Sequence, residues 1–248
     1  MLKIVSNMKL IKHIIYIGVI LLSSCTTLYE LDNKQNNIIS VSATPDSLIT
    51  SIIAPYKVGI DSVMNEVLCI SNIEISKSKG ESLIGNFVTD LCLDQYSNLS
   101  DICIMNTGGL RSPLPKGEIT RGKIYELMPF DNELVILELN EEDFNGLLNY
   151  IVSRKGEPFS GLSIKMNSQN QLLSYKLNNS INFSNGEEIR VITSDYLANG
   201  GDKMWFFKDK TQTKVGIKLR DAIINYCKEN ETITSEIDGR LEIISDEK

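Results

Sequence analysis

The sequence predicts one domain of the mixed α/β class, with mixed β-sheet covered by helices. Of its 248 residues, 42% are hydrophobic and 23% are charged, which is typical of a globular chain that buries a core. Some segments have the alternating apolar residues of a β-strand, and others have apolar residues at helical spacing. The two kinds of segment follow one another along the chain. Such an alternation favours sheets covered by helices, although periodicity alone leaves the topology open.

The first 24 residues have the parts of a signal peptide. Basic residues precede the apolar run 14–22, and two serines come before Cys25. The run is much shorter than the about 20 residues that a membrane span needs, so an uncleaved anchor helix is the weaker alternative. The four residues that end at Cys25 resemble a bacterial lipobox, whose cysteine is acylated and becomes the new N-terminus. We expect a signal peptide at 1–24 and a lipid anchor on Cys25. A polar tether at 25–37 and a domain at 38–248 would follow, on the periplasmic or cell-surface side of the membrane.

Cleavage would change both the charge and the chemistry of the chain. It removes three lysines and no acidic residue, so the net charge falls from −7 to −10. An acidic body disfavours nucleic acid and anionic membrane surfaces as partners. Cleavage also removes His13, the only histidine. Catalysis by a Ser-His-Asp triad and zinc binding by histidine are therefore excluded for the mature chain.

Four cysteines remain after cleavage: Cys69, Cys92, Cys103 and Cys227. An even number outside the cytoplasm permits disulfides. No CxxC pair is present and three of the four have apolar neighbours, so buried free thiols are an equal alternative. Metal binding is a remote third option, and the pairing stays open.

The elements of the N-terminal half follow from periodicity and breakers. We expect an edge strand at 38–42 and then a helix capped by Asp46 that Pro55 breaks or kinks. A strand at 67–75 and a helix with Glu81 in its first turn, running to Leu93 or Tyr96, complete this half.

The stretch 101–113 is the centre of the prediction. Residues 102–105 are predicted to form a buried strand that ends in Asn106, and the glycine pair Gly108 and Gly109 follows. No Cβ obstructs a ligand at the two glycines, while the Asn106 amide and the Arg111 guanidinium flank them. This is the layout of a small-molecule site, although the same residues also suit an ordinary turn.

The remaining elements are predicted by similar patterns. In chain order they are a turn at 117–120, a helix from Arg121, a strand at 133–139, a helix opening at 141, a mobile loop at 156–161, strands at 162–166, 172–177 and 189–194, a packing segment at 205–207, a helix at 215–226 and a strand at 237–244.

Several ordered motifs support a family assignment. They are 80–90 (GESLIGNFVTD), 106–111 (NTGGLR), 127–130 (LMPF), 195–202 (DYLANGGD) and 238–240 (DGR). In order and spacing this set resembles the C-terminal, substrate-binding domain of the 5'-nucleotidase family, over roughly residues 65–243. The resemblance implies that domain's α/β fold and a nucleotide or nucleoside as ligand.

The resemblance also implies a base stacked between two rings. These rings belong to Phe130 and to Tyr196, which takes the place of a family phenylalanine and keeps the stacking face. Stacked aromatic pairs contribute about 0.5–1.5 kcal/mol beyond area burial.

The polar groups of the implied site are Asn106, Arg111 and Asp202, which would meet the base, ribose or phosphate. Each has a structural alternative, namely a turn cap for Asn106, an ion pair for Arg111 and ordering of its own loop for Asp202. The family also places an arginine shortly before the Gly-Asn pair at 85–86. Here residues 76–79 read Ser-Lys-Ser-Lys, and lysine lacks the two-pronged contact of arginine.

The hydrolytic half of the family has no counterpart in this sequence. Family enzymes split the phosphate ester with two metal ions held by Asp, Asn and His of a separate N-terminal domain. Only about 40 residues lie between Cys25 and residue 65. We therefore expect no catalytic residue, metal ligand or cofactor in this chain. Its role would be the nucleotide-binding part of a split 5'-nucleotidase, with the divalent metals on a separately encoded metallophosphatase. The alternatives are a stand-alone nucleotide-binding lipoprotein and a purely structural one.

Overall fold

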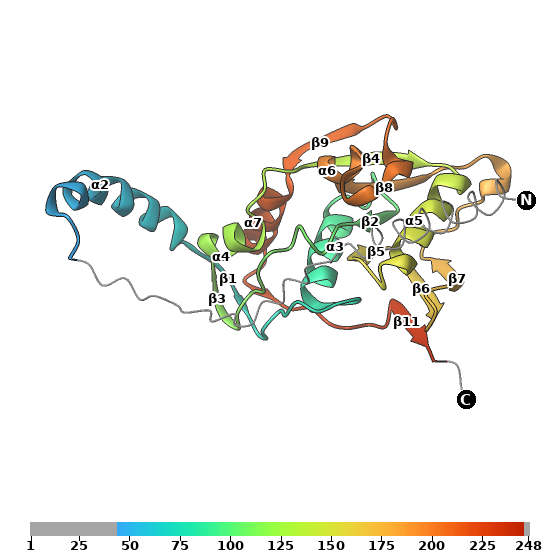
Figure 1. Ribbon diagram of the computed structural model, residues 1–248, viewed down its shortest axis with the longest axis horizontal. Helices are drawn as coiled ribbons and strands as arrows, with labels where there is room; N and C mark the ends of the chain where they lie inside the picture. The colour runs from blue at the N-terminus through green and yellow to red at the C-terminus, as the bar shows by residue number, and fades with distance from the viewer. Residues whose placement is uncertain (1–43, 246–248) are drawn as a thin grey trace, which may run out of the picture. The chain divides into compact units, whose positions relative to one another are not determined.

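The structure is a computed structural model that describes residues 44–245 (Figure 1). The chain divides into two units, Met1–Asp46 and Ser47–Lys248, and the second contains every described helix and strand. The signal peptide, Cys25, the tether and the strand expected at 38–42 lie outside the described residues. Within residues 44–245, no helix combines the length and the apolar character that crossing a membrane requires.

A five-stranded sheet positions the central motif. Its order is β5 (Phe159–Ser160), β2 (Ile102–Ile104), β8 (Ile189–Ser194), β4 (Glu133–Leu139) and β9 (Thr213–Lys218). β2 and β8 are parallel, with Ile102 opposite Val191, and the other pairs are antiparallel. Because parallel strands end at the same edge, the loops that follow β2 and β8 emerge side by side.

Two smaller sheets complete the fold, and each is also mixed. One has the order β10 (Thr232–Ile233), β1 (Val67–Ser71) and β3 (Gly117–Thr120), and the other has the order β11 (Leu241–Ile244), β6 (Leu162–Asn167) and β7 (Leu172–Leu177). In both sheets the central strand has one parallel and one antiparallel neighbour. The predicted class, mixed α/β in one domain, is confirmed.

The described α-helices are α2 (Ser47–Met64), α3 (Leu83–Gln95), α4 (Arg121–Leu127), α5 (Glu141–Ser153), α6 (Asp195–Ala198) and α7 (Leu219–Glu229). Four of them begin after a residue whose side chain accepts the free N–H of the third helical residue, and these caps are Ser82, Thr120, Asn140 and Ser194. Such caps are the local signals that fix where a helix starts.

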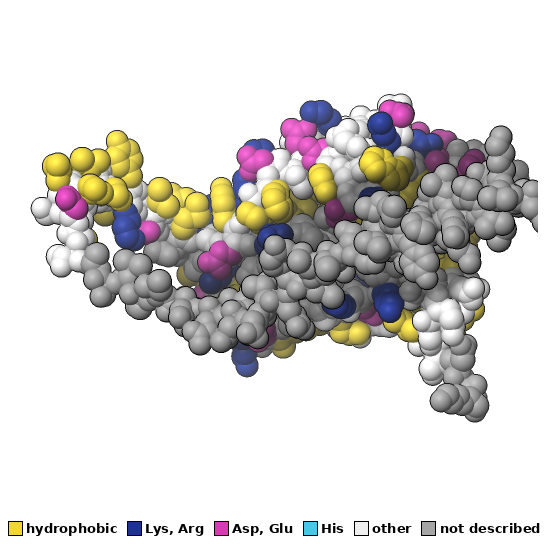
Figure 2. Space-filling model, viewed as in Figure 1, with side chains coloured by type: hydrophobic (Ala, Val, Ile, Leu, Met, Phe, Trp, Pro, Cys, Tyr) yellow, Lys and Arg dark blue, Asp and Glu magenta, His cyan; other side chains and the backbone are white. Residues whose placement is uncertain are grey.

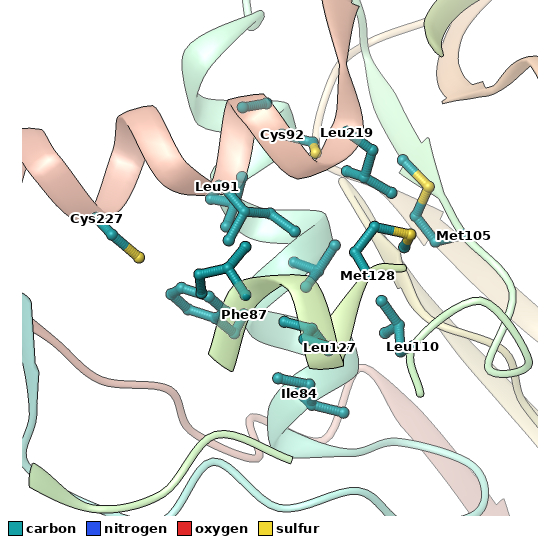
Figure 3. Packing of buried hydrophobic residues seen from close by; sticks show 14 of the residues in the cluster. Ile84, Phe87, Leu91, Cys92, Met105, Leu110, Leu127, Met128, Leu219 and Cys227 are labelled. Atoms are coloured by element: carbon teal, nitrogen blue, oxygen red, sulfur yellow. The ribbon is translucent and has the colours of Figure 1, made fainter. Parts of the chain in front are cut away.

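The core lies on both faces of the five-stranded sheet. Cys103, Ile136 and Ile192 face one cluster with α3 and α7, whereas Ile104 and Val135 face a second cluster with α5. Alternate residues of one strand therefore enter opposite clusters, as the period of two requires. Figure 3 shows the first cluster, where side chains of α3 and α7 meet those of α4.

α2 differs from the other long helices because none of its residues is buried. Figure 2 shows hydrophobic side chains gathered along it, and these include Ile52, Ile53 and Tyr56. Of the break or kink expected at Pro55, the break is absent, since α2 runs through this residue as one helix. In an exposed helix the backbone carbonyl that proline leaves without a donor is satisfied by water.

Other element predictions also differ from the structure, and the helix predicted to have Glu81 in its first turn begins at Leu83. Residues 117–120 form strand β3 rather than a turn, and the helix expected at 215–226 begins only at Leu219, after strand β9. The strands expected at 67–75 and 237–244 are shorter, because β1 ends at Ser71 and β11 begins at Leu241. Pairing with distant strands decides these cases, and local periodicity does not report such pairing.

Candidate functional site

A pocket of about 390 Å³ opens at the edge where β2 and β8 end. It is lined by Asn106, Gly108, Gly109, Arg111, Phe130, Asn132, Tyr196 and Asp202. All seven residues predicted to bind substrate are among them, and Asn132 is the one that the sequence analysis missed. The volume of the pocket falls in the range of about 300–1,000 Å³ that is usual for small-molecule sites.

Three separate segments supply the lining. Asn106 and the glycine pair follow β2, Tyr196 and Asp202 follow β8, and Phe130 lies in the loop between α4 and β4. The parallel pairing of β2 and β8 brings the first two segments together, and the third enters because β4 pairs with β8. The meeting of these segments is therefore a result of sheet topology.

Asp202 ties two of the segments to each other. The Asn106 amide donates to Asp202 Oδ2 at 2.6 Å, and the Tyr196 hydroxyl donates to Oδ1 at 3.0 Å. Asp202 has a φ of +50° and Gly200, two residues earlier, has a φ of +85°, so this tight turn depends on left-handed backbone. The carboxylate orders the mouth of the pocket, and each oxygen keeps the capacity to accept a further bond from a ligand.

The guanidinium of Arg111 is available to contact a ligand. Its side chain is exposed, and Nη1 donates to the Gly108 carbonyl at 3.4 Å, which is a weak contact. Among residues 44–245 no carboxylate lies in ion-pair contact with it. The structural ion pair that was the alternative role for Arg111 is therefore absent from the described part of the chain.

The two aromatic rings are accessible. Phe130 is 42% exposed and Tyr196 is 45% exposed, while most large hydrophobic residues of this domain are buried. The loop after Phe130 is fixed at Asp131, which accepts from Lys218 Nζ at 3.0 Å and also pairs with Arg220. These two cations lower the pKa of Asp131. Phe130 is therefore an exposed ring on a restrained loop, which suits stacking against a planar ligand.

The segment 156–161 is not the mobile loop that its glycines predict. It contains strand β5, and its Glu157 carboxylate is buried. Glu157 accepts from the backbone N–H and the hydroxyl of Thr107, both at 2.7 Å, and from Arg154 Nε at 2.9 Å. Glu157 thus fixes the glycine loop through Thr107. A single glutamate between glycine and proline gives no sequence signal for this role.

Lys77 lies near the position at which the family has its arginine, and it also supports the glycine loop. Its ammonium donates to the Leu110 carbonyl at 2.7 Å. Lys77 is absent from the residues that line the pocket. In the structure this lysine contacts loop backbone.

The glycine pair yields a test of the loop geometry. A Cβ on Gly109 would lie 2.7 Å from Asn106 Oδ1, whereas the nearest atom to a Cβ on Gly108 is Asn106 Nδ2 at 3.4 Å. We expect Gly109→Ala to destabilise the domain by about 1 kcal/mol or more, because Asn106 is buried and must shift. For a domain of this size the melting temperature would fall by about 2–4 °C. Gly108→Ala is the matched control and should change it little. Equal melting temperatures in calorimetric scans would contradict this account of Gly109.

Comparison with known proteins identifies the family. The family model described as "5'-nucleotidase, C-terminal domain" matches residues 60–209, which is more than half of the chain. The chain belongs to this family. The matched range includes all seven residues predicted for the pocket.

Relatives and solved structures agree with the assignment. An apyrase of Tabanus yao is 26% identical over 73% of this chain and 38% of its own length. A cell wall protein of Listeria monocytogenes is 27% identical over 80% of this chain and 30% of its own length. The 5'-nucleotidase precursor of Thermus thermophilus superposes with a TM-score of 0.68 at 22% identity, over 82% of this chain and 44% of the other. The fold is thus shared, and the chain spans less than half of the length of each of these proteins.

Proposed function

We propose that this chain is the nucleotide-binding part of a split 5'-nucleotidase-type hydrolase that works in nucleotide breakdown. The observation that carries the proposal is the pocket itself, in which two exposed rings, one from the α4–β4 loop and one from α6, accompany an amide, a guanidinium and a carboxylate. Flat rings select a planar heterocycle, and the guanidinium suits phosphate oxygens or ribose hydroxyls. A nucleoside monophosphate or a nucleoside supplies these features together.

The residues of the pocket do not fit a divalent metal. Such ions take several carboxylate, carbonyl or imidazole ligands. The pocket offers one carboxylate, Asp202, whose oxygens already accept from Asn106 and Tyr196, and it contains the cation of Arg111. Across residues 44–245 no group of three or more His, Cys, Asp or Glu residues is arranged to hold a metal. We assign metal binding and ester hydrolysis to a separately encoded metallophosphatase.

The surface of α2 supports a protein partner. Its exposed residues Ile52, Ile53 and Tyr56 are the kind of apolar patch that marks an interaction site. Its only charged side chains, Lys57 and Asp61, pair with each other at 2.5 Å, so the helix has no net charge. A helix that lies on a membrane usually has an excess of Lys and Arg on its polar face, so α2 fits a protein surface better.

The proposed location is outside the cytoplasm, with the chain held by a lipid on Cys25. The Listeria relative is named a cell wall protein, which supports an extracytoplasmic site for this chain too. Mass spectrometry of Cys25 in protein from membranes would test the anchor. An unmodified Cys25 in an intact N-terminus would contradict it.

Binding and hydrolysis are separable in one experiment. We expect the purified chain to bind AMP in calorimetry at micromolar to millimolar concentration, and to release no phosphate from AMP in the presence of Mg²⁺ or Mn²⁺. Adenosine and a UDP-sugar would show whether the phosphate or the base dominates recognition. If the chain binds nucleotides but the cell has no hydrolytic partner for it, the chain is a stand-alone nucleotide-binding lipoprotein.

Rapid phosphate release by the chain alone would defeat the split-enzyme proposal. A failure to bind any nucleotide at millimolar concentration would favour a structural lipoprotein.

A further inference from the structure

The four cysteines of the described residues meet in two pairs. Cys69 in β1 and Cys227 in α7 are neighbours, because α7 packs against β1. Cys92 in α3 and Cys103 in β2 are likewise neighbours, because α3 packs against β2. All four are free thiols in the structure, and all four are buried. Four cysteines can pair in three ways, and the fold places the cysteines close together for one of these three pairings.

The fold fixes these pairs firmly. All four cysteines belong to one core cluster, in which α7 packs against β1 and α3 packs against β2. Figure 3 shows Cys92 and Cys227 inside this cluster, among the side chains of α3 and α4. Neighbouring thiols on elements that already pack together need only small movements to reach the S–S bond length of about 2.05 Å.

The cysteines have no part in the site described above, because none of them lines the pocket. Nor do they form a metal-holding group with other residues between 44 and 245. The neighbouring Cys69 thiol and burial raise the pKa of Cys227, while burial and the Cys92 thiol raise the pKa of Cys103. All four thiols are buried, so an oxidant cannot reach them once the domain has closed. Oxidation must therefore happen while the chain folds.

We propose that Cys69–Cys227 and Cys92–Cys103 form two disulfide bonds when the chain folds outside the cytoplasm. This rests on the location given under the proposed function, since disulfides persist in oxidising compartments. Each bond forms by exchange with the disulfide of an oxidant, either a small-molecule disulfide or a disulfide oxidoreductase. One cysteine thiolate attacks the oxidant and releases its first thiol. The second cysteine then displaces the remaining thiol. The pair loses two electrons and two protons, and the oxidant is reduced to two thiols.

The two bonds would have different effects. Cys69–Cys227 joins the first strand to the last helix and encloses most of the domain, whereas Cys92–Cys103 closes the short connection from α3 to β2. Because the entropy removed from the unfolded chain grows with loop length, the first bond should stabilise more. We expect reduction of both to lower the melting temperature by about 10 °C.

Peptide mapping tests the pairing directly. The full-length chain is denatured, reduced and refolded in a glutathione redox buffer. Free thiols are then alkylated in denaturant, and the protein is digested without reductant. Linked peptides that contain Cys69 with Cys227 and Cys92 with Cys103 are the expected result. Alkylation of all four of Cys69, Cys92, Cys103 and Cys227, or linkage of Cys69 to Cys92 or Cys103, would overturn the proposal.

Two single variants sharpen the test. In Cys69→Ala we expect Cys227 to become alkylated while Cys92–Cys103 remains linked, and Cys92→Ala should show the reverse. Mapping of the unmodified chain decides the matter even if a variant fails to fold.

Protein recovered from the export compartment extends the test to the cell. Linked pairs in that sample are expected. Reduced pairs there, despite bonds in the refolded sample, would overturn formation in the cell. AMP binding measured on the same samples reports on the nucleotide site separately, so the two proposals can fail independently.

Discussion

Replacement of Phe130 by alanine is expected to weaken AMP binding by about 10- to 100-fold. Removal of a stacked ring costs about 1–3 kcal/mol per base, and about 1.4 kcal/mol corresponds to a factor of ten in affinity. Phe130 is exposed and lies outside both core clusters, so the loss should appear in affinity with little change in stability. Titration calorimetry and a thermal melt on the same sample measure both quantities.

Tyr196 allows the stacking face to be separated from the hydroxyl. Tyr196→Ala removes the ring together with its hydrogen bond to Asp202, so its loss of affinity should equal or exceed that of Phe130→Ala. Tyr196→Phe keeps the ring, and we expect a loss of only a few-fold, from a less ordered Asp202.

A matched control is Tyr56→Ala, which removes an exposed ring from α2, away from the residues of the pocket. If Phe130→Ala binds AMP as tightly as Tyr56→Ala, the rings do not hold the base. The pocket would then recognise AMP through its polar groups alone.

The sequence predicted well those features that leave a local or motif signal. Strand β4 has the predicted bounds, because Glu133–Leu139 alternates and pairs on both sides. The helix of Glu141–Ser153 likewise begins where an asparagine cap precedes a run of acidic residues. The pocket residues were found through ordered motifs, since no periodicity shows that the loop after β2 lies next to the loop after β8.

Features that depend on distant partners were missed. Glu157 supports Thr107 across 50 positions of the chain, and strand β9 exists because β4 accepts it as an edge neighbour. Neither segment differs from an ordinary loop or helix in its own residues. Cysteine pairing is the same kind of property, because it follows from which helix packs on which strand. The stability prediction below also rests on such a partner set.

Replacement of Arg240 is expected to have the largest effect on stability among the single substitutions that we propose. Its side chain is 9% exposed, and its guanidinium makes bidentate ion pairs with two carboxylates. Nη1 and Nη2 donate to the two oxygens of Asp90 at 2.7 and 2.9 Å, while Nε and Nη2 donate to the two oxygens of Asp238 at 2.9 and 2.8 Å. Nη1 also donates to the Phe159 carbonyl at 2.9 Å, so Arg240 joins α3, β5 and the segment before β11.

Arg240→Ala leaves two carboxylates close together with no cation between them. Removal of one member of a buried ion network costs about 3–5 kcal/mol. Because the carboxylate side chains are 47% and 41% exposed and regain some hydration, we expect the lower end, about 3 kcal/mol. The melting temperature should fall by roughly 6–12 °C. Arg240→Lys keeps the charge and loses the planar fork, so its stability should be intermediate.

The same network predicts a dependence on pH. Its hydrogen bonds from Arg240 lower the pKa of Asp238 to about 2. The folded-state pKa lies below the unfolded value of about 3.9, so this stabilisation is complete above about pH 4 and is lost as the pH falls toward 2. In Arg240→Ala this component is absent at every pH. The gap in unfolding free energy between wild type and Arg240→Ala should therefore narrow as the pH falls from 4 to 2.

A neighbouring surface ion pair supplies the control. Lys165 and Glu242 pair at 2.7 Å across β6 and β11, but their side chains are 54% and 51% exposed. Exposed pairs contribute about 0–1 kcal/mol, so Lys165→Ala should be nearly neutral. Urea denaturation of the three proteins at pH 7 and pH 3 gives the comparison. If Arg240→Ala loses no more stability than Lys165→Ala at pH 7, then burial of the guanidinium offsets all that its four carboxylate contacts contribute. The packing of apolar side chains in the two clusters would then be enough to hold β11 in place.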